Sequence, residues 1–374
     1  MKRILLVNDI ACGGGVEKLM MDFVNAWHDK YELTVLLLDQ EKKEYNDGTF
    51  PENVRVIIQD QLSDSRNPLK WGYIKFVRHY KNKFIKDSIN NSNYDLVIAM
   101  KDGWVSKYVA ETAVDTKIMW HHTDYNSYYY TYDIFGGPKT EFEFLKRYQY
   151  VVCVSEDVKN GIKDIIGDTG NLVVKYNPLK WEEIIEKAKE PVVDVVKEDG
   201  KTYFTVVGRI NYQKGYDLLL EAAHMLEIDG YNFEVWVVGG TESWSDEQYR
   251  LERSVKRLGI KSVKFLGVRK NPYKYMKYAD WVLSSSIFEG FSFVSQEAAI
   301  LDKPMLLTDC GGVRELLGDN EYGLVMEKSV IGIYQGMKKV LDNPGLLEGY
   351  TKKICERKSI INYDDRMAEI EKIL

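Results

Sequence analysis

Two glutamates in the second half of the chain have the type and spacing expected where a sugar is held beside a diphosphate. Glu289 lies in a loop after the apolar run 281–284, and Glu297 follows, after seven intervening residues, in a predicted helix. The backbone amides at the start of that helix suit an anion such as a diphosphate. A carboxylate on the loop can hold sugar hydroxyls, and one two turns into the helix can accept hydrogen bonds from a vicinal diol.

Two cations precede these glutamates and also follow an apolar run. Arg209 and Lys214 come after residues 203–207, and a turn containing Gly311 and Gly312 follows a third run. Arg can grip phosphate oxygens as a fork, and Lys adds a point charge. In open parallel sheets ligands bind outside the carboxyl ends of the strands, so we expect these residues at one edge of a sheet. For either cation alone, a surface salt bridge is the alternative interpretation.

Three motifs, in this order, resemble the family-4 retaining glycosyltransferases with the GT-B fold. They are Gly-Arg-x4-Lys-Gly at 208–215, Glu-Gly-Phe-Ser-x4-Glu at 289–297 and Gly-Gly-x-x-Glu at 311–315. The resemblance covers almost the whole chain. It implies that Arg209 and Lys214 bind the donor diphosphate and take part in catalysis.

The resemblance also implies the other contacts of the donor, with UDP as the most frequent nucleotide of the family. Glu289 holds the transferred sugar as a catalytic residue, and Glu297 takes the ribose hydroxyls. The backbone lies beside the sugar or near the nucleotide base at Gly239, Val268, Gly290, Phe291 and Ser292.

Two adjacent histidines, His121 and His122, follow the apolar run 117–120 in the first half. In the family that the chain resembles, a histidine after this strand lies beside the reacting sugar and commonly binds one of its hydroxyls. His122 fits the family's Trp-apolar-His-x-Asp pattern with Asp124 and is the predicted catalytic histidine, with His121 as its competitor. A zinc site is disfavoured because the chain has only 5 histidines and no His-x3-His pair.

The acceptor is predicted to meet the same part of the first half. Gly13–Gly15 would let the backbone approach a phosphate or the acceptor closely, with Gly15 assigned to the donor; a plain tight turn is the alternative. Tyrosines between positions 125 and 132 could stack on the sugar rings of an acceptor, or else pack within a long loop. The residues predicted to contact the acceptor are Gly14, His121, Asp124 and Tyr125.

A basic and aromatic segment spans residues 67–90. It holds six Lys or Arg residues and one Asp, a local charge of +5 in a chain of net charge −6. An amphipathic helix of this kind can lie in a membrane interface and attract anionic lipid headgroups. A domain helix with a solvated basic face is the alternative.

Composition excludes several classes of protein. At about 150 residues per domain, the 374 residues predict two to three domains. The acidic balance argues against nucleic acid as a partner. The 4 cysteines lie far apart without a Cys-x-x-Cys pair, which fits a reducing cytoplasm. The first apolar run is too short for a signal peptide, and none approaches the ~18 residues of a membrane span. We therefore expect a cytoplasmic protein whose membrane contact, if any, is peripheral, on the inner face of the cell membrane.

Apolar runs of strand length alternate with helical patterns, which predicts parallel sheets covered on both faces. The series restarts after the interruption between Pro178 and Pro191. We expect an α/β fold with two doubly wound, Rossmann-like domains facing across a cleft. The predicted domains are 1–178 for the acceptor, 179–350 for the nucleotide sugar, and a helical tail, 351–374, that packs back on the first domain.

The predicted reaction moves a hexose from a nucleotide diphosphate to a hydroxyl of a glycan or lipid-linked glycan. The resemblance implies retention of the anomeric configuration. Arg209, Lys214 and the helix amides would neutralise the leaving diphosphate. The chain has no Asp-x-Asp pair, so we expect transfer without a metal or other cofactor. No residue stands out as a covalent nucleophile, and a front-face mechanism with the donor phosphate as base is the working hypothesis.

Three rival interpretations stay open. An NAD-dependent dehydrogenase would use Asp39 on the ribose, but Gly13-x-Gly15-x-x-Lys18 lacks the third glycine of a dinucleotide site. A non-catalytic two-domain sugar-binding protein would have no need of paired phosphate cations. The third rival keeps the fold and epimerises or hydrolyses the sugar nucleotide.

Overall fold

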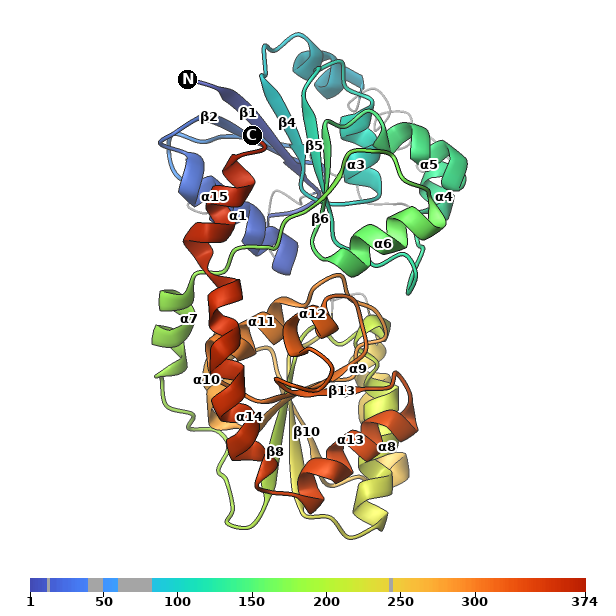
Figure 1. The fold of residues 1–374 in the computed structure, drawn as a ribbon, viewed down its shortest axis with the longest axis vertical. Coiled ribbons are helices and arrows are strands. Elements are labelled where there is room, and N and C mark those ends of the chain that lie inside the picture. The colour runs from blue at the N-terminus through green and yellow to red at the C-terminus, as the bar shows by residue number, and fades with distance from the viewer. Residues whose placement is uncertain (12–13, 40–49, 60–82, 242–244) are drawn as a thin grey trace. The chain divides into compact units, whose positions relative to one another are not determined.

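The computed structural model describes residues 1–11, 14–39, 50–59, 83–241 and 245–374 (Figure 1). The chain divides into two compact units. Unit 1 comprises Met1–Val154, Val158–Asn177 and Glu369–Leu374, and unit 2 comprises Ser155–Asp157 and Pro178–Ala368. The tail 351–374 is thus divided between the units after Ala368.

Unit 1 is built on a parallel sheet. Among the described residues its seven strands follow the order β3-β2-β1-β4-β5-β6-β7. The direction of winding reverses between β1 and β4, and ligands of such sheets bind beside that switch point. The strands are β1 (Arg3–Asn8), β2 (Glu32–Leu37), β3 (Arg55–Ile58), β4 (Leu96–Ala99), β5 (Lys117–His121), β6 (Tyr150–Cys153) and β7 (Leu172–Val174).

Helices cover the sheet of unit 1 because each has one apolar face. In α1, Leu19, Phe23 and Trp27 recur every four residues and are fully buried, and the Phe23 and Trp27 rings stack with centroids 4.4 Å apart. Trp27 Nε1 also donates to Glu371 Oε1 over 3.1 Å, which ties the end of the chain to unit 1. The helices are α1 (Gly15–Trp27), α3 (Trp104–Ala110), α4 (Tyr132–Phe135), α5 (Pro138–Leu145) and α6 (Glu156–Ile165).

Unit 2 repeats this plan with a six-stranded parallel sheet within the part of the chain that the structure describes. Its order is β10-β9-β8-β11-β12-β13, and the winding reverses between β8 and β11. The strands are β8 (Thr202–Val207), β9 (Phe233–Val238), β10 (Val263–Gly267), β11 (Trp281–Ser284), β12 (Met305–Thr308) and β13 (Leu324–Met326).

The helices of unit 2 enclose its core, which contains Phe204, Leu219, Val237 and Leu283. None of the helices in the described ranges is long and apolar enough to span a membrane. The last helix begins in unit 2 and ends in unit 1. The helices, with two 3-10 turns (η), are α7 (Trp181–Ala188), η3 (Tyr212–Lys214), α8 (Tyr216–Ile228), α9 (Glu247–Leu258), α10 (Tyr273–Tyr278), α11 (Phe293–Ile300), α12 (Val313–Leu317), α13 (Val330–Asp342), α14 (Leu346–Ile354), η4 (Cys355–Ile361) and α15 (Tyr363–Glu371).

The predicted fold class is confirmed: each unit is a Rossmann-like α/β layer structure with a parallel sheet. The sequence patterns did not indicate β3 or β13. They have four and three residues, and each lies at an edge of its sheet.

Candidate active site

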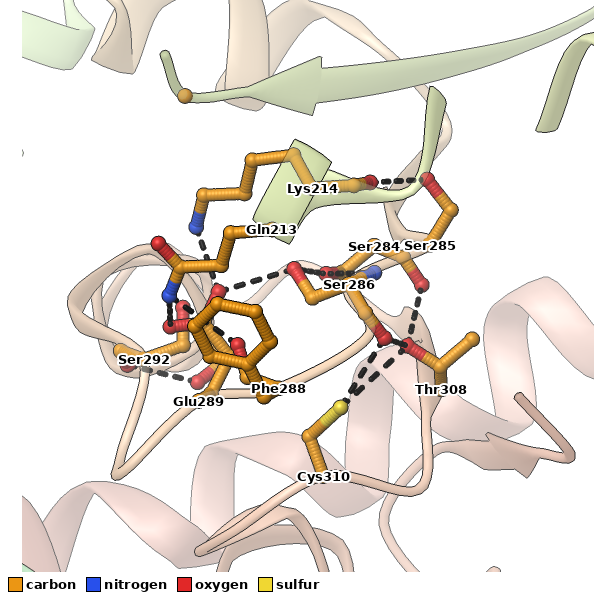
Figure 2. A network of polar contacts seen from close by, with 12 residues as sticks. Gln213, Lys214, Ser284, Ser285, Ser286, Phe288, Glu289, Ser292, Thr308 and Cys310 are labelled. Carbon is orange, nitrogen blue, oxygen red and sulfur yellow. Dashed lines mark hydrogen bonds and ion pairs between the residues drawn. The ribbon is translucent and has the colours of Figure 1, made fainter. Parts of the chain in front are cut away.

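The Glu289 carboxylate lies at the centre of a polar network in unit 2 (Figure 2). Lys214 Nζ lies 2.6 Å from Glu289 Oε1, and Ser286 Oγ donates to the same oxygen over 2.9 Å. Gln213 Nε2 donates to Oε2 over 3.3 Å. Only 12% of the Glu289 side chain and 17% of the Lys214 side chain are exposed. The two form a largely buried ion pair whose carboxylate accepts two further hydrogen bonds.

The turn that carries Lys214 is fastened to the loop after β11. η3 ends at Gly215, whose φ of +60° is left-handed. A Cβ on Gly215 would lie 2.1 Å from Ser285 O, so only glycine lets the two segments approach so closely. Ser285 Oγ donates to Lys214 O over 2.7 Å, and Ile287 N donates to Gln213 O over 2.8 Å. In the Lys-Gly pair of the motif, Lys214 therefore supplies the charge and Gly215 allows the close approach of the two backbone segments.

The end of β12 supports the same loop. Thr308 Oγ1 donates to Ser286 O over 2.6 Å, and Cys310 Sγ donates to that carbonyl over 3.0 Å (Figure 2). Burial raises the pKa of the Cys310 thiol to about 12, with the Glu289 charge adding to the effect, so the thiol keeps its proton. Residues that follow β8, β11 and β12 thus meet in one network.

Apart from Gly15, which is the first residue of α1 in unit 1, the other residues predicted for the donor lie after strands of the same sheet or in the following helix. Glu297, in α11, is 6% exposed and accepts a hydrogen bond from Tyr273 Oη over 3.0 Å. Arg209 is exposed just after β8. Ser292 is the N-cap of α11 without a side-chain cap, so the first-turn amides keep their anion-binding capacity. Gly239 follows β9, Val268 follows β10, and Gly290 and Phe291 are buried after β11.

Unit 1 gathers a second polar cluster after β4 and β5. His122 N donates to Asp102 Oδ1 over 3.4 Å, and His122 Nε2 lies 2.9 Å from Met100 O. His121 Nε2 lies 3.8 Å from Asp102 Oδ2, and the His121 ring packs edge-on against Tyr125 with centroids 4.5 Å apart. His121 is fully buried, whereas His122 is half-buried.

The protonation of this cluster follows from its burial. Burial lowers the pKa of His122 to about 4 despite the Asp102 carboxylate beside it, so the ring is neutral at pH 7. Burial is the largest single influence on the pKa of Asp102 and raises it, but interactions with His121 and His122 and hydrogen bonds from Thr123 and the backbone together leave that pKa lowered. Asp102 was not among the predicted residues, although a carboxylate three residues after a buried strand was a signal that could have found it.

The tyrosine-rich loop after β5 has an inner and an outer side. Tyr125 is 2% exposed and donates from its hydroxyl to Glu141 over 2.6 Å, and Tyr129 donates to Glu141 over 3.0 Å. Asp124 is buried and accepts from Asn126 N and Ser127 Oγ. Tyr125 and Asp124, both predicted at the acceptor, thus support the loop from within. The exposed rings are Tyr128 and Tyr132.

The glycines after β1 lie next to an ion cluster that the sequence patterns did not indicate. Gly14 is the N-cap of α1 and Gly15 its first residue, while Gly13 lies outside the described residues. A Cβ on Gly14 would lie 2.6 Å from Glu17 Oε2. Lys101 Nζ lies 4.0 Å from Glu17 Oε1 and 2.7 Å from Asp9 Oδ2.

Most of the basic, aromatic segment, residues 67–82, lies outside the described residues. Its described part, residues 83–90, is helical. Phe84 is exposed, and Lys86 Nζ lies 2.5 Å from Glu111 Oε2. The membrane contact predicted for 67–90 therefore stays a prediction.

Comparison with known proteins agrees with the motifs. The model of the family described as "Glycosyl transferases group 1" matches residues 189–357. The N-acetylgalactosamine-N,N'-diacetylbacillosaminyl-diphospho-undecaprenol 4-alpha-N-acetylgalactosaminyltransferase of Campylobacter jejuni is 26% identical over 360 residues, which cover 92% of this chain and 91% of that protein. The uncharacterised glycosyltransferase MJ1607 of Methanocaldococcus jannaschii is 28% identical over 218 residues, 55% of each chain.

Solved structures match over the full length at low identity. A UDP-glucose complex of Anabaena Alr3699/HepE has a TM-score of 0.78 and 16% identity, covering 100% of this chain and 99% of that chain. Sucrose-phosphate synthase of Thermosynechococcus elongatus has a TM-score of 0.76 and 16% identity, with 100% and 98% covered. At such identity the likeness establishes the fold alone, which is GT-B. The group 1 domain and the named glycosyltransferases among the relatives lead to one conclusion: this chain is a glycosyltransferase.

Proposed function

We propose that the protein transfers a hexose, N-acetylhexosamines included, from a UDP-sugar to a hydroxyl of a lipid-linked glycan, with retention and without a metal. The observation that carries the proposal is the Lys214–Glu289 pair after β8 and β11. Lys214 Nζ, a cation that would attract a diphosphate, lies 2.6 Å from the Glu289 carboxylate, which would accept hydrogen bonds from sugar hydroxyls. Both charges are held by the turn and loop that bear the family's motifs.

The donor is bound by unit 2 in this proposal. Arg209, Lys214 and the first-turn amides of α11 take up charge as the diphosphate leaves, because fixed donors act without reorganisation during the reaction. Glu289 orients the sugar, and Glu297 takes the ribose diol. The UDP complexes of Alr3699/HepE support UDP as the nucleotide. Metal independence rests on the two cations and the helix amides in place of a bound ion.

The acceptor is bound by unit 1. We assign the contact with a hydroxyl of the reacting sugar to His122, because it is half-buried and neutral whereas His121 is fully enclosed against Tyr125. The exposed Tyr128 and Tyr132 are the aromatic surface for acceptor rings. The lipid-linked substrate named for the Campylobacter relative supports an acceptor of that class. Docking on the inner membrane face through residues 67–90 would follow from such an acceptor.

The direct test is calorimetric titration of UDP, GDP, ADP and NADH into the purified protein with EDTA present. We expect UDP to bind, and Arg209→Ala and Lys214→Ala each to weaken that binding. A screen of UDP-glucose, UDP-galactose and their N-acetylamino forms then identifies the sugar. Preference for GDP or ADP would replace the donor while keeping the fold, and binding of NADH alone would overturn the proposal and return attention to Asp39.

Transfer itself is tested with a lipid-linked acceptor in vesicles that contain anionic phospholipid. Product from this acceptor and its absence with free sugars support the acceptor class. Charge reversal at Lys75, Arg78 and Lys81 should weaken vesicle binding; unchanged binding would reject membrane docking through this segment while leaving the transfer reaction standing.

A further inference from the structure

The ion pair in unit 2 has a consequence that depends on which nucleotide occupies the site. Lys214 and Glu289 are in direct contact, and Ser286 and Gln213 donate hydrogen bonds to the same carboxylate (Figure 2). Both side chains are largely buried. A charge in such a position that loses its partner without gaining another is destabilising. A ligand that draws Lys214 away must therefore also supply hydrogen-bond donors to the Glu289 carboxylate.

An intact sugar nucleotide has interaction partners for both the Lys214 ammonium and the Glu289 carboxylate. Its diphosphate attracts the Lys214 ammonium, and the hydroxyls of its sugar can donate to the Glu289 carboxylate. A nucleoside diphosphate without the sugar has a partner for Lys214 only. Its anionic oxygens compete with Glu289 for Lys214, offer the carboxylate no donor, and place like charges close together.

We propose that the Lys214–Glu289 pair makes the site discriminate between the donor and the spent nucleotide: it favours the intact UDP-sugar and weakens the binding of UDP. This inference rests on the proposed function, because it takes a UDP-sugar as donor. It assigns Glu289 a second role, in expelling the product. Release of product limits turnover in many enzymes, so such a device would act on the overall rate.

The test compares two ligands in the wild type and in Glu289→Gln. The probes are UDP and the more tightly bound of UDP-glucose and UDP-N-acetylgalactosamine, titrated with EDTA present. Glu289→Gln removes the charge and keeps the size of the side chain. We expect its Kd for UDP to fall by about fivefold or more, because the carboxylate that competes with UDP for Lys214 is gone, and its Kd for the UDP-sugar to stay or rise.

Two further variants make the result specific. Glu297→Gln is the matched control, because ribose is common to both ligands; it should weaken both by the same factor. In a Lys214→Gln background, Glu289→Gln should change the Kd for UDP by much less than it does alone, since the cation for which the two anions compete is gone. Thermal unfolding of each variant shows that it is folded.

The possible outcomes separate the inference from the function beneath it. A lower Kd for UDP in Glu289→Gln, together with a reduced preference for the UDP-sugar, supports the inference. If UDP binds the wild type but Glu289→Gln leaves its Kd within twofold, the inference fails and the proposed function stands. If neither UDP nor a UDP-sugar binds the wild type, the proposed donor and the inference fail together.

Discussion

The two polar clusters of this protein are built in opposite ways. In unit 2, Lys214 and Glu289 are in direct contact, and neighbouring side chains such as Ser286 donate hydrogen bonds to the carboxylate. In unit 1, Asp102 Oδ2 and both ring nitrogens of His121 are buried without a hydrogen bond to any described residue, and the closest approach of Asp102 and His121 is 3.8 Å. The first cluster is complete within itself. The second cluster has buried polar atoms that make no hydrogen bond within it, and leaving such atoms unpaired costs free energy.

The difference indicates a division of labour. A prepositioned cation suits a diphosphate, whose negative charge grows as it leaves, because such a cation stabilises that charge with little rearrangement. A neutral histidine held beside a carboxylate suits an uncharged hydroxyl, which can both donate and accept. We therefore expect substitutions in unit 2 to act on donor binding and turnover, and those in unit 1 to act on turnover with the nucleotide affinity unchanged.

The largest effect is expected from Glu289→Ala. Loss of the carboxylate that we propose to hold the sugar should lower kcat by about 10³-fold, as for removal of a group that orients the reacting centre, while UDP binds at least as tightly as before. Transfer assays and UDP titration measure the two quantities. Near-normal turnover would remove Glu289 from the mechanism and with it the contrast between the units.

Lys214→Gln should lower kcat/KM by about 10²-fold and weaken UDP as well as the UDP-sugar. In the proposed binding mode the Lys214 charge contacts both ligands, whereas Glu289 contacts only the sugar of the UDP-sugar. Isotherms of the two nucleotides, with Lys338→Gln as a control for loss of a surface lysine, measure the effect. A variant that kept full affinity for UDP would place the diphosphate elsewhere.

Asp102→Asn tests unit 1 by itself. We expect kcat to fall by roughly tenfold, because the amide no longer fixes the two histidine rings by charge, while the Kd for UDP stays within twofold. A fall in kcat with an unchanged Kd for UDP would support the separate roles of the two units. An equal loss of UDP affinity would show that the clusters are not independent.

A smaller effect is expected on stability. The pKa of His122 is lowered to about 4 in the folded protein, against an ordinary value of 6.5 that the unfolded chain should show. Between these values the unfolded chain binds more protons, so the free energy of unfolding rises as pH rises from 4 to 6.5 and is lost as pH falls through that window. The full shift would correspond to roughly 3 kcal/mol, and solvent at the half-buried ring reduces it, so denaturant titrations should show about 1 kcal/mol or more of this dependence, reduced in His122→Gln. An unchanged slope in that variant would assign the dependence to other groups.

The sequence patterns predicted the elements that bear the site better than the partners within it. The runs 203–207, 281–284 and 305–307 became β8, β11 and β12 almost to the residue, because buried parallel strands are continuously apolar. The four predicted donor side chains lie after strands or in the following helix. In unit 1 the histidines were found, but Asp102 and Lys101 after β4 and Glu17 in the first turn of α1 were not, since single charges form no motif; only the position of Asp102 after a buried strand was a signal.

Thus the sequence by itself determined the α/β class, the restart of the strand series and the chemical types available for a phosphorylated sugar. These are local properties, written in apolar runs and in short motifs. Only the tertiary structure decided which of those groups meet. Lys214 and Glu289 are 75 residues apart, and they touch because β8 and β11 are neighbours in the sheet and because Gly215 lets their loops come close. Strand order and close approach are properties of packing, and packing also turned Tyr125 inward and left Tyr128 outside.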